Sequence, residues 1–592
     1  MAFMVVARML FLAYNLPLSA DLTTAEIFLA MLHGLRMDAS MAGYFLALCG
    51  LLLTVSMLVP GPWIYRTLLG LTFMLLLLSA VVVTADLELY RHWGFRMNNT
   101  PFFYMGKGAV GSVEVWVVIK LVGLLIILFL FFWWLFIRVV APGIRTLPAV
   151  RKSYAVVMLI ISGLMFIPIR GSFSVAPMNT GFVYFHTTKA FANHAAINVI
   201  WNFLYSVQKG SSESYPEKFF DHSETTKHFS ALYPHEDSTA HLLKTTRPDI
   251  ILIVLESFTA DVIEPLGGVP GVTPRINEFC REGVLFDNFY ATGDRTDKGL
   301  IGILSGYPAQ PTTSIIKNPS KTQKLPHLNQ YLKKMGYHSS FIYGGDIDFA
   351  NFRSYLTIGG FDHITTMDAF PAALNESKWG VHDHFMFDQA LKELDSTRSP
   401  FVKIILTLSS HEPFDVPMPP QFQGNDHESL FLNSCFYTDK SLGAFIDSLR
   451  LRPQWENTWI IITADHGHRH PRNKALKDKE RFRIPMLWMG GAIKKDTVIH
   501  TLSGQTDIAE TVLAQLGSPE RDFTFGKNIL AANCVPFAAY YFNDGYGFLT
   551  PGKYIVHDNP GKQFLVSEGA TEHDLNVSKA YQQMLFSDYN GK

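Results

Sequence analysis

The chain has 592 residues, of which 48% are hydrophobic and only 17% are charged, and its formal net charge is −1. This composition excludes an intrinsically disordered protein and a protein that coats nucleic acid. The charge is unevenly distributed: the first 170 residues contain 12 Lys and Arg against 6 Asp and Glu, and the other 422 contain 38 against 45. We therefore expect an apolar membrane region followed by a domain with a core of its own.

Five apolar segments in the first 170 residues have the length of a membrane-spanning helix. About 20 apolar residues are needed to cross the hydrocarbon layer, because every backbone amide must be bonded within the helix. The segments are residues 1–20, 39–65, 67–85, 121–137 and 153–169, and only the first contains a charged residue, Arg8. For residues 1–20 a cleaved signal peptide is the alternative. Residues 1–170 are thus predicted to form a transmembrane domain of about five helices.

The charges between these segments predict the orientation of the protein. With the N-terminus inside, the inner loops hold only basic residues, namely Arg8, Arg66, Arg138, Arg145, Arg151 and Lys152. An excess of Lys and Arg on the cytoplasmic side is the general rule for membrane proteins. An odd number of spans then places residues 248–592 outside the cytoplasm. We expect a multi-pass protein of the plasma (inner) membrane with an extracytoplasmic domain.

Residues 171–247 are predicted to connect these two parts. Residues 190–207 are apolar with helical periodicity, which is typical of an amphipathic segment lying along a membrane or along the domain. The run 209–246 is polar and is interpreted as a linker. Its four histidines lack the close spacing of metal ligands and are interpreted as solvated residues.

From residue 248 onward, short apolar runs alternate with amphipathic stretches of helix length. The clearest runs are Asp249–Leu255 and residues 339–343, 401–408, 459–463 and 484–488. This alternation is typical of a mostly parallel sheet covered by helices on both faces. Residues 248–592 are therefore predicted to form an α/β domain.

Side chains with metal-binding chemistry follow three of the predicted strands. Glu256 follows the first strand, His411 comes after the third, and Asp465 and His466 follow the fourth. Ligands of open α/β sheets bind at the carboxyl ends of the strands, so we expect these side chains to converge. Two carboxylates and an imidazole suit a divalent cation such as Mn, Mg or Zn. The alternative for each residue alone is a polar strand end without a ligand.

A candidate nucleophile lies in residues 291–306. Thr296 directly precedes a short polar stretch and an apolar helical run, which places it at or near a helix N-terminus. Free backbone amides and the helix dipole would stabilise a phosphate there. Coordination by a cation would also lower the pKa of the hydroxyl, as a Thr requires to attack phosphorus. A plain N-cap role for Thr296 is the alternative.

These motifs resemble the lipoteichoic acid synthase family within the alkaline phosphatase and sulfatase superfamily. The resemblance rests on Glu256-Ser257, Thr296 before a helix, and residues 409–413 and 464–467, in this order. It extends over nearly the whole chain, including the five spans and residues 34–38, 484–486 and 505–507. It implies an N-terminal polytopic α-helical membrane domain and a C-terminal α/β sulfatase-like domain with a central, mostly parallel sheet.

The resemblance also implies a reaction. Glu256, Thr296, Asp465 and His466 would bind one divalent metal, with Mn favoured and Mg or Zn as alternatives. Thr296 would attack the phosphodiester of an anionic phospholipid, usually phosphatidylglycerol, and release diacylglycerol. The phosphoglycerol held on Thr296 would then pass to a hydroxyl acceptor on a polymer or a glycan.

Two further residues match positions that serve the substrate in the family. Arg353 would clamp the phosphate, and His411 would bind substrate and act in general acid/base catalysis. The sequence departs from the family nearby: residues 343–345 are Tyr-Gly-Gly in place of His-Gly-Asn, and Asn351 or Phe352 fills the position of a Trp. Because the family residues contact the transferred group, the metal chemistry is better supported than the substrate.

Three other functions stay open. A phosphoethanolamine transferase would use the same site, although such enzymes usually carry several disulfides and only Cys280, Cys435 and Cys534 lie outside the apolar segments. A phospholipid head-group hydrolase would need no acceptor. A catalytically inactive, membrane-anchored binding protein would need no metal ligands at all. Sulfate ester hydrolysis is disfavoured, because Thr296 lies in no Cys/Ser-x-Pro-x-Arg setting.

Overall fold

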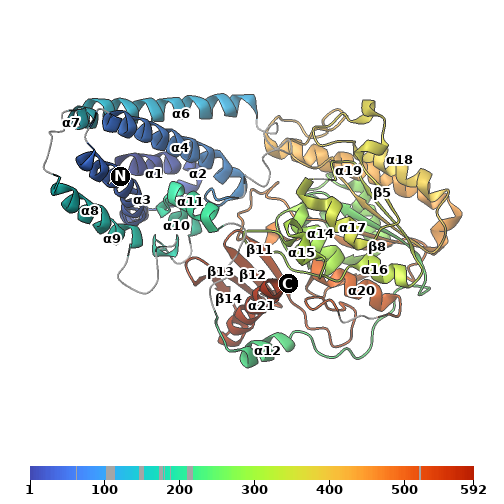
Figure 1. The fold of residues 1–592 in the computed structure, drawn as a ribbon. Helices are drawn as coiled ribbons and strands as arrows, with labels where there is room; N and C mark the ends of the chain where they lie inside the picture. Colours follow the sequence, from blue (N-terminus) through green and yellow to red (C-terminus); the bar gives the residue numbers. More distant parts are fainter. Residues whose placement is uncertain are drawn as a thin grey trace. The chain divides into compact units, whose positions relative to one another are not determined.

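The computed structural model describes residues 1–592 apart from residues 60, 62, 100, 102–113, 146–151, 172–177, 179, 184, 187–188, 210–217, 348 and 519–521. The chain forms two compact units, whose elements are labelled in Figure 1. Unit 1 comprises Met1–Glu213 and Asp558–Leu565, and unit 2 comprises Ser214–His557 and Val566–Lys592.

Unit 1 is built from apolar helices. Its principal elements are α1 (Ala2–Tyr14), α3 (Thr24–Leu58), α4 (Trp63–Trp93), α6 (Val115–Leu135), α7 (Ala141–Arg145), α8 (Tyr154–Leu164) and α9 (Phe166–Arg170). Three helices are long and apolar enough to cross a membrane, namely Thr24–Leu58, Trp63–Trp93 and Val115–Arg145, among the residues that the structure describes. The first and last predicted spans correspond to the shorter apolar helices Ala2–Tyr14 and Tyr154–Arg170. The three long helices indicate a membrane protein, and the five-span topology stays a prediction.

The predicted orientation counts Arg8 as a charge in an inner loop. In the structure, Arg8 instead forms a buried ion pair. It lies within α1, and its guanidinium donates to both oxygens of Asp38 on α3 at 2.8 and 2.9 Å. The two side chains are 2% and 0% exposed. Gly34 leaves the room, because a Cβ there would lie 2.2 Å from the guanidinium. Asp38 reaches Arg8 because α3 begins at Thr24, so that residues 34–38 lie within this helix rather than in a loop between two spans. Of the other basic residues in the orientation argument, Arg151 lies outside the described residues.

The apolar part of the connecting segment packs within unit 1. It forms α10 (Ala190–Ala196) and α11 (Val199–Lys209), which contact α3 and α4. Ala192, Ala195 and Trp201 are buried there. The predicted amphipathic segment therefore lies against the helices of this unit.

Part of the predicted linker is folded into unit 2. Helix α12 (His222–Ser230) packs on the C-terminal helix α21 (Glu572–Gly591), with the Phe229 ring 5.9 Å from the Tyr581 ring. The compact unit 2 begins at Ser214, and the domain bounds at residues 170 and 247 stay a prediction.

The core of unit 2 is an eight-stranded sheet with the order β5-β4-β6-β1-β7-β8-β2-β9. Its strands are β1 (Asp249–Leu255), β2 (Val284–Phe286), β4 (His338–Tyr343), β5 (His363–Thr365), β6 (Phe401–Leu406), β7 (Thr458–Ala464), β8 (Met486–Met489) and β9 (Thr497–Ile499). All pairings are parallel except those of β8. The five predicted strands are therefore present, and the predicted mostly parallel sheet is confirmed.

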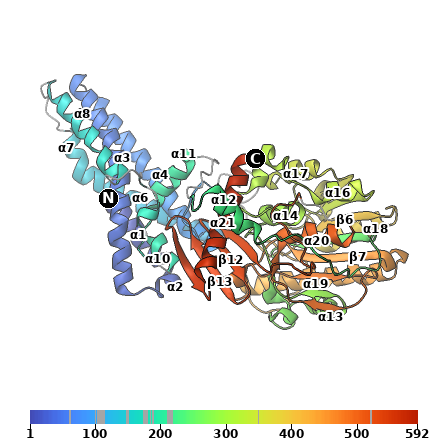
Figure 2. The ribbon, with the colours of Figure 1, turned by 90° about the horizontal axis from the view of Figure 1, so that it is seen from below.

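Helices cover both faces of this sheet. Helix α19 (His427–Arg450) contacts α13 (Pro274–Glu282) and α18 (Asp383–Leu394), and helix α14 (Thr296–Ser305) contacts α16 (Leu328–Lys334) and α20 (Ile508–Gln515). Strand β7 lies between α14 and α20 on one side and α13 and α19 on the other (Figure 2). All seven residues of β1 are buried, as expected for a strand with an apolar layer on each side. A second sheet contains β11 (Ala538–Phe542), β12 (Gly545–Thr550), β13 (Lys553–Asp558) and β14 (Gln563–Glu568).

Candidate active site

Three side chains expected to converge lie together at the carboxyl ends of the two central strands. Strand β1 pairs with β7 so that Leu255 lies opposite Ala464. The residues that follow, Glu256 and Asp465, therefore leave the sheet side by side. One ligand atom from each of Glu256, Asp465 and His466 lies within 4.8 Å of the others.

Ser257 fixes the geometry of this cluster. Its backbone N–H donates to Asp465 Oδ1 at 2.8 Å, and its hydroxyl donates to Glu256 Oε1 at 2.7 Å. The same hydroxyl lies 3.4 Å from His466 Nε2. Ser257 has a φ of +56°, an unfavourable conformation for a residue with a Cβ, which turns the chain sharply after β1. Nothing in the sequence signals this backbone conformation, so Ser257 could be recognised only as part of a motif.

Thr296 lies against the cluster. It is the first residue of α14, as predicted, and it is only partly buried. Its hydroxyl donates to Glu256 Oε2 at 3.1 Å. Gly299 makes this approach feasible, because a Cβ at that position would lie 1.8 Å from the Asp465 carbonyl oxygen. The helix thus contacts the backbone of a cluster residue directly.

Gln505 holds the backbone of the cluster through hydrogen bonds. Its Nε2 donates to the carbonyl oxygens of Ala464 and Asp465 at 2.8 and 2.6 Å, and its Oε1 accepts from Thr292 N at 2.9 Å. The side chain is fully buried. Gln505 therefore joins the end of β7 to the loop that leads into α14, a role that its motif in the sequence does not reveal.

The electrostatics of the cluster fit a divalent cation. Burial opposes ionisation of Glu256, but the hydrogen bond from His466 and the charges of His411 and His466 outweigh it and hold the pKa of Glu256 well below its ordinary value. Burial and the charge of Glu256 raise the pKa of Asp465. Burial opposes the charged form of His466, yet Asp465 and Glu256 raise its pKa to about 9. Asp465 Oδ2 is buried without a hydrogen-bond partner among the described residues. A dication would satisfy this oxygen and relieve the repulsion between the carboxylates.

Comparisons with known proteins agree with this architecture. Residues 248–518 match the sulfatase family. These residues form a sulfatase-family domain. The chain is 24% identical over 335 residues to the lipoteichoic acid synthase-like YvgJ of Bacillus subtilis, which covers 52% of each chain. It is 27% identical over 290 residues to phosphoglycerol transferase I of Xanthomonas campestris, covering 46% of this chain and 41% of the relative. The chain thus spans about half the length of these relatives.

Solved structures show the same fold for the sulfatase-family domain. The lipoteichoic acid synthase LtaP from Listeria monocytogenes has a TM-score of 0.52 and 18% identity, covering 62% of this chain and 97% of that one. A protein of the alkaline phosphatase superfamily from Vibrio parahaemolyticus has a TM-score of 0.55 and 23% identity, covering 64% of this chain and 97% of that one. The predicted fold class and family resemblance are confirmed.

His411 lies near the cluster of the sulfatase-family domain. The hydroxyl of the preceding residue, Ser410, donates to the Glu256 carbonyl oxygen at 2.5 Å, and this bond holds the neighbouring His411 near Glu256. His411 Nδ1 donates to the carbonyl oxygen of Glu412 at 2.8 Å, so Nε2 is the free acceptor of the neutral ring. Arg353 is exposed on α17 (Phe352–Gly359), and its role as a phosphate clamp stays a prediction.

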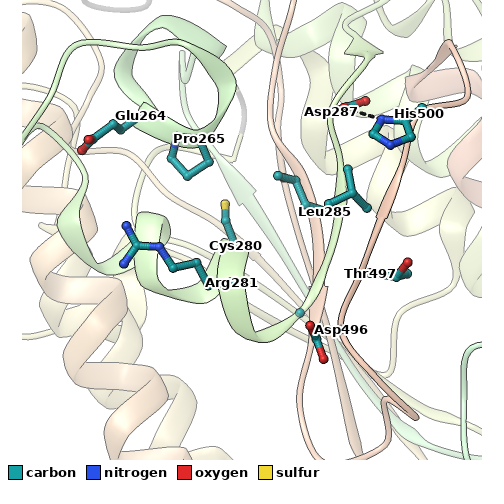
Figure 3. A pocket seen from close by; sticks show the side chains of 11 residues that line it. Glu264, Pro265, Cys280, Arg281, Leu285, Asp287, Asp496, Thr497 and His500 are labelled. Carbon is teal, nitrogen blue, oxygen red and sulfur yellow. Dashed lines mark hydrogen bonds and ion pairs between the residues drawn. The ribbon is translucent and has the colours of Figure 1, made fainter.

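A cavity of about 780 Å³ lies elsewhere in the sulfatase-family domain. Its walls include Cys280 and Arg281 of α13, Leu285 of β2 and Thr497 of β9 (Figure 3). Strands β2 and β9 form one edge of the sheet, whereas the cluster follows the central strands β1 and β7. No predicted site residue lines this cavity.

Proposed function

We propose that the protein is a membrane-anchored, metal-dependent transferase that moves phosphoglycerol from a phospholipid to a hydroxyl acceptor on a polymer or a glycan. One observation carries the proposal: the Thr296 hydroxyl is hydrogen-bonded to Glu256 at 3.1 Å, within a cluster whose residues fit a divalent cation. Relatives named phosphoglycerol transferase and lipoteichoic acid synthase support this choice of reaction. Phosphatidylglycerol is the proposed donor, and the catalytic domain is proposed to be extracytoplasmic.

Glu256, Asp465, His466 and the Thr296 hydroxyl would hold one cation, with Mn favoured. The bound metal would lower the pKa of the Thr296 hydroxyl and neutralise charge on the phosphoryl oxygens. The carboxylate of Glu256 accepts the hydroxyl hydrogen in the structure and so orients the oxygen for attack. The position of Thr296 at the start of α14 adds free backbone amides for the phosphate.

The reaction would proceed by two displacements at phosphorus. In the first, Thr296 Oγ1 forms a bond to phosphorus while the bond to the diacylglycerol oxygen breaks. Thr296 would pass its proton to Glu256, which accepts its hydrogen bond, while His411, protonated on Nε2 at the outset, would give that proton to the departing oxygen. His411 Nε2 would then take the proton of the acceptor hydroxyl in the second step, and Glu256 would return its proton to Thr296. In the second, the acceptor hydroxyl bonds to phosphorus and releases Thr296. Arg353 would bind the phosphoryl oxygens.

The intact mass of the full chain after incubation with Mn and phosphatidylglycerol tests this proposal. We expect an adduct of about 154 Da on the parent, and none on Thr296→Ala. Thr296→Ser keeps a hydroxyl at the same place and serves as the matched control, with the adduct retained. An adduct of equal yield on Thr296→Ala would refute the assignment of the nucleophile.

The alternatives give different outcomes in the same experiment. A phosphoethanolamine transferase would be modified by phosphatidylethanolamine instead. A head-group hydrolase would release glycerophosphate without an acceptor, and an inactive binding protein would release no diacylglycerol from either lipid.

A further inference from the structure

A second loop is fixed beside the strand end at which the sequence departs from the family. Gly345, which follows β4, forms an antiparallel bridge with Gly380. The φ of Gly380 is +143°, and a Cβ there would lie 2.0 Å from the Gly344 carbonyl oxygen, so this close approach requires glycine. Lys378 and Trp379 directly precede Gly380 and are therefore held next to the carboxyl end of β4.

Trp379 is also tied to His411. Trp379 Nε1 and His411 Nδ1 donate to the same acceptor, the carbonyl oxygen of Glu412, at 2.7 and 2.8 Å. One carbonyl oxygen has two lone pairs and can accept both bonds. The centroids of the two rings are 4.5 Å apart. Trp379 thus forms a wall against the imidazole that lies near Glu256.

Lys378 adds a positive charge to this wall. Its Nζ lies 5.0 Å from the centroid of the Trp379 ring. The nitrogen is buried and has no hydrogen-bond partner in the part of the chain that the structure describes. Buried polar groups are nearly always bonded, and an ammonium has three donors to satisfy. The charge of Glu412 acts on Lys378, and the same carboxylate lies 3.4 Å from His427.

We infer that Lys378 and Trp379 form the head-group side of the active site, and that Lys378 is a specificity-determining residue that excludes amine-bearing head groups. This inference rests on the proposed function. It assigns a role to a loop that supplies none of the predicted metal ligands.

Electrostatics gives the reason for the exclusion. A second ammonium brought next to Lys378 in a partly desolvated site would be repelled, and like charges are repelled more strongly there than in water. Trp379 offers no compensation, because its face already carries the ammonium of Lys378 and a second cation would have to share it. A glycerol head group carries hydroxyls that can accept hydrogen bonds from Lys378 and brings no positive charge.

Competition between two lipids tests the inference. The full chain is incubated with Mn and mixed micelles that contain equal amounts of phosphatidylglycerol and phosphatidylethanolamine. The two adducts on Thr296 differ in mass, at about 154 and about 123 Da, so their ratio is read from one spectrum. We expect the parent to favour the glycerol adduct, and Lys378→Met to raise the share of the ethanolamine adduct by about ten-fold or more. Lys378→Arg keeps the charge and should keep the parent ratio.

Each contrary result has a distinct meaning. The same ratio for Lys378→Met and the parent would overturn this inference and leave the proposed function intact. Loss of both adducts in Lys378→Met, with both retained in Lys378→Arg, would also overturn it, because Lys378 would then serve the phosphoryl group rather than the choice of head group. Absence of any adduct on the parent would overturn the proposed function itself.

Discussion

Replacing Gly299 with alanine tests whether the contact between α14 and Asp465 sets the position of Thr296, the proposed nucleophile. The added Cβ would lie 1.8 Å from the Asp465 carbonyl oxygen, whereas an ordinary non-bonded contact is about 3.5 Å. Backbone atoms cannot rotate away as a flexible side chain can. The start of α14 and the end of β7 must therefore separate by more than about 1 Å.

Two effects of different size follow from this displacement. Overpacking of this kind lowers the free energy of unfolding by about 1–3 kcal/mol, and the better helix propensity of alanine returns up to about 1 kcal/mol. The effect on catalysis is larger, since a misplacement of about 1 Å at a reacting group can reduce turnover about 100-fold. We therefore expect Gly299→Ala to fold, with reduced affinity for Mn and severely reduced release of diacylglycerol.

The assay compares three chains by thermal unfolding, by Mn binding and by diacylglycerol release. Gly591→Ala is the matched control, because Gly591 also lies in a helix of unit 2 and an added Cβ there has no atom within 4 Å. This control should behave like the parent. If Gly299→Ala also kept the parent's turnover and Mn affinity, the reasoning from this contact would be refuted.

Three further predictions concern Gln505, the buried His327 and the proposed cation. Gln505→Leu should lower the free energy of unfolding by about 2–4 kcal/mol and weaken Mn binding, because it leaves the Thr292 N–H and two carbonyl oxygens unsatisfied. Unchanged values of both quantities would argue against this role of Gln505. Burial lowers the pKa of His327 to about 3, so the unfolded chain takes up the proton first and stability is lost as the pH falls below about 6.5. Between pH 7.5 and 5 the parent should therefore lose about 2 kcal/mol more than His327→Asn, measured by urea unfolding, and parallel curves would contradict this. Mn at 100 times its dissociation constant should raise the free energy of unfolding of the parent by about 2.7 kcal/mol and should not raise that of Asp465→Asn. A similar rise in both chains would count against the assigned ligands.

The strands and the convergence of the cluster could be predicted from sequence because both depend on local patterns. The run Asp249–Leu255 is apolar throughout, and the strand in the structure has the same bounds. Glu256 and Asp465 each directly follow such a run, so a parallel sheet brings them together with no further information. Thr296 begins a helix as predicted, because an apolar helical run follows it.

The contacts that hold the site could not be predicted, because they depend on tertiary packing. The positive φ of Ser257, the approach of α14 at Gly299 and the three bonds of Gln505 join segments far apart in the chain. In the same way, the pairing of Arg8 with Asp38 depends on α3 starting early, which a count of charges between apolar segments does not detect.

The hydrogen bond from Ser257 to Asp465 joins residues 208 positions apart, and this separation has a consequence for biosynthesis. The strands of a parallel sheet that are distant in sequence pair late, because a long loop must close first. If the domain is extracytoplasmic, as proposed, a chain emerging from the translocation machinery would carry Thr296 long before Asp465, His466 and Gln505 had been made. The proposed nucleophile would therefore pass the lipid surface while it lacked the groups proposed to activate it, and reactivity would arise only when the last central strand joined the sheet.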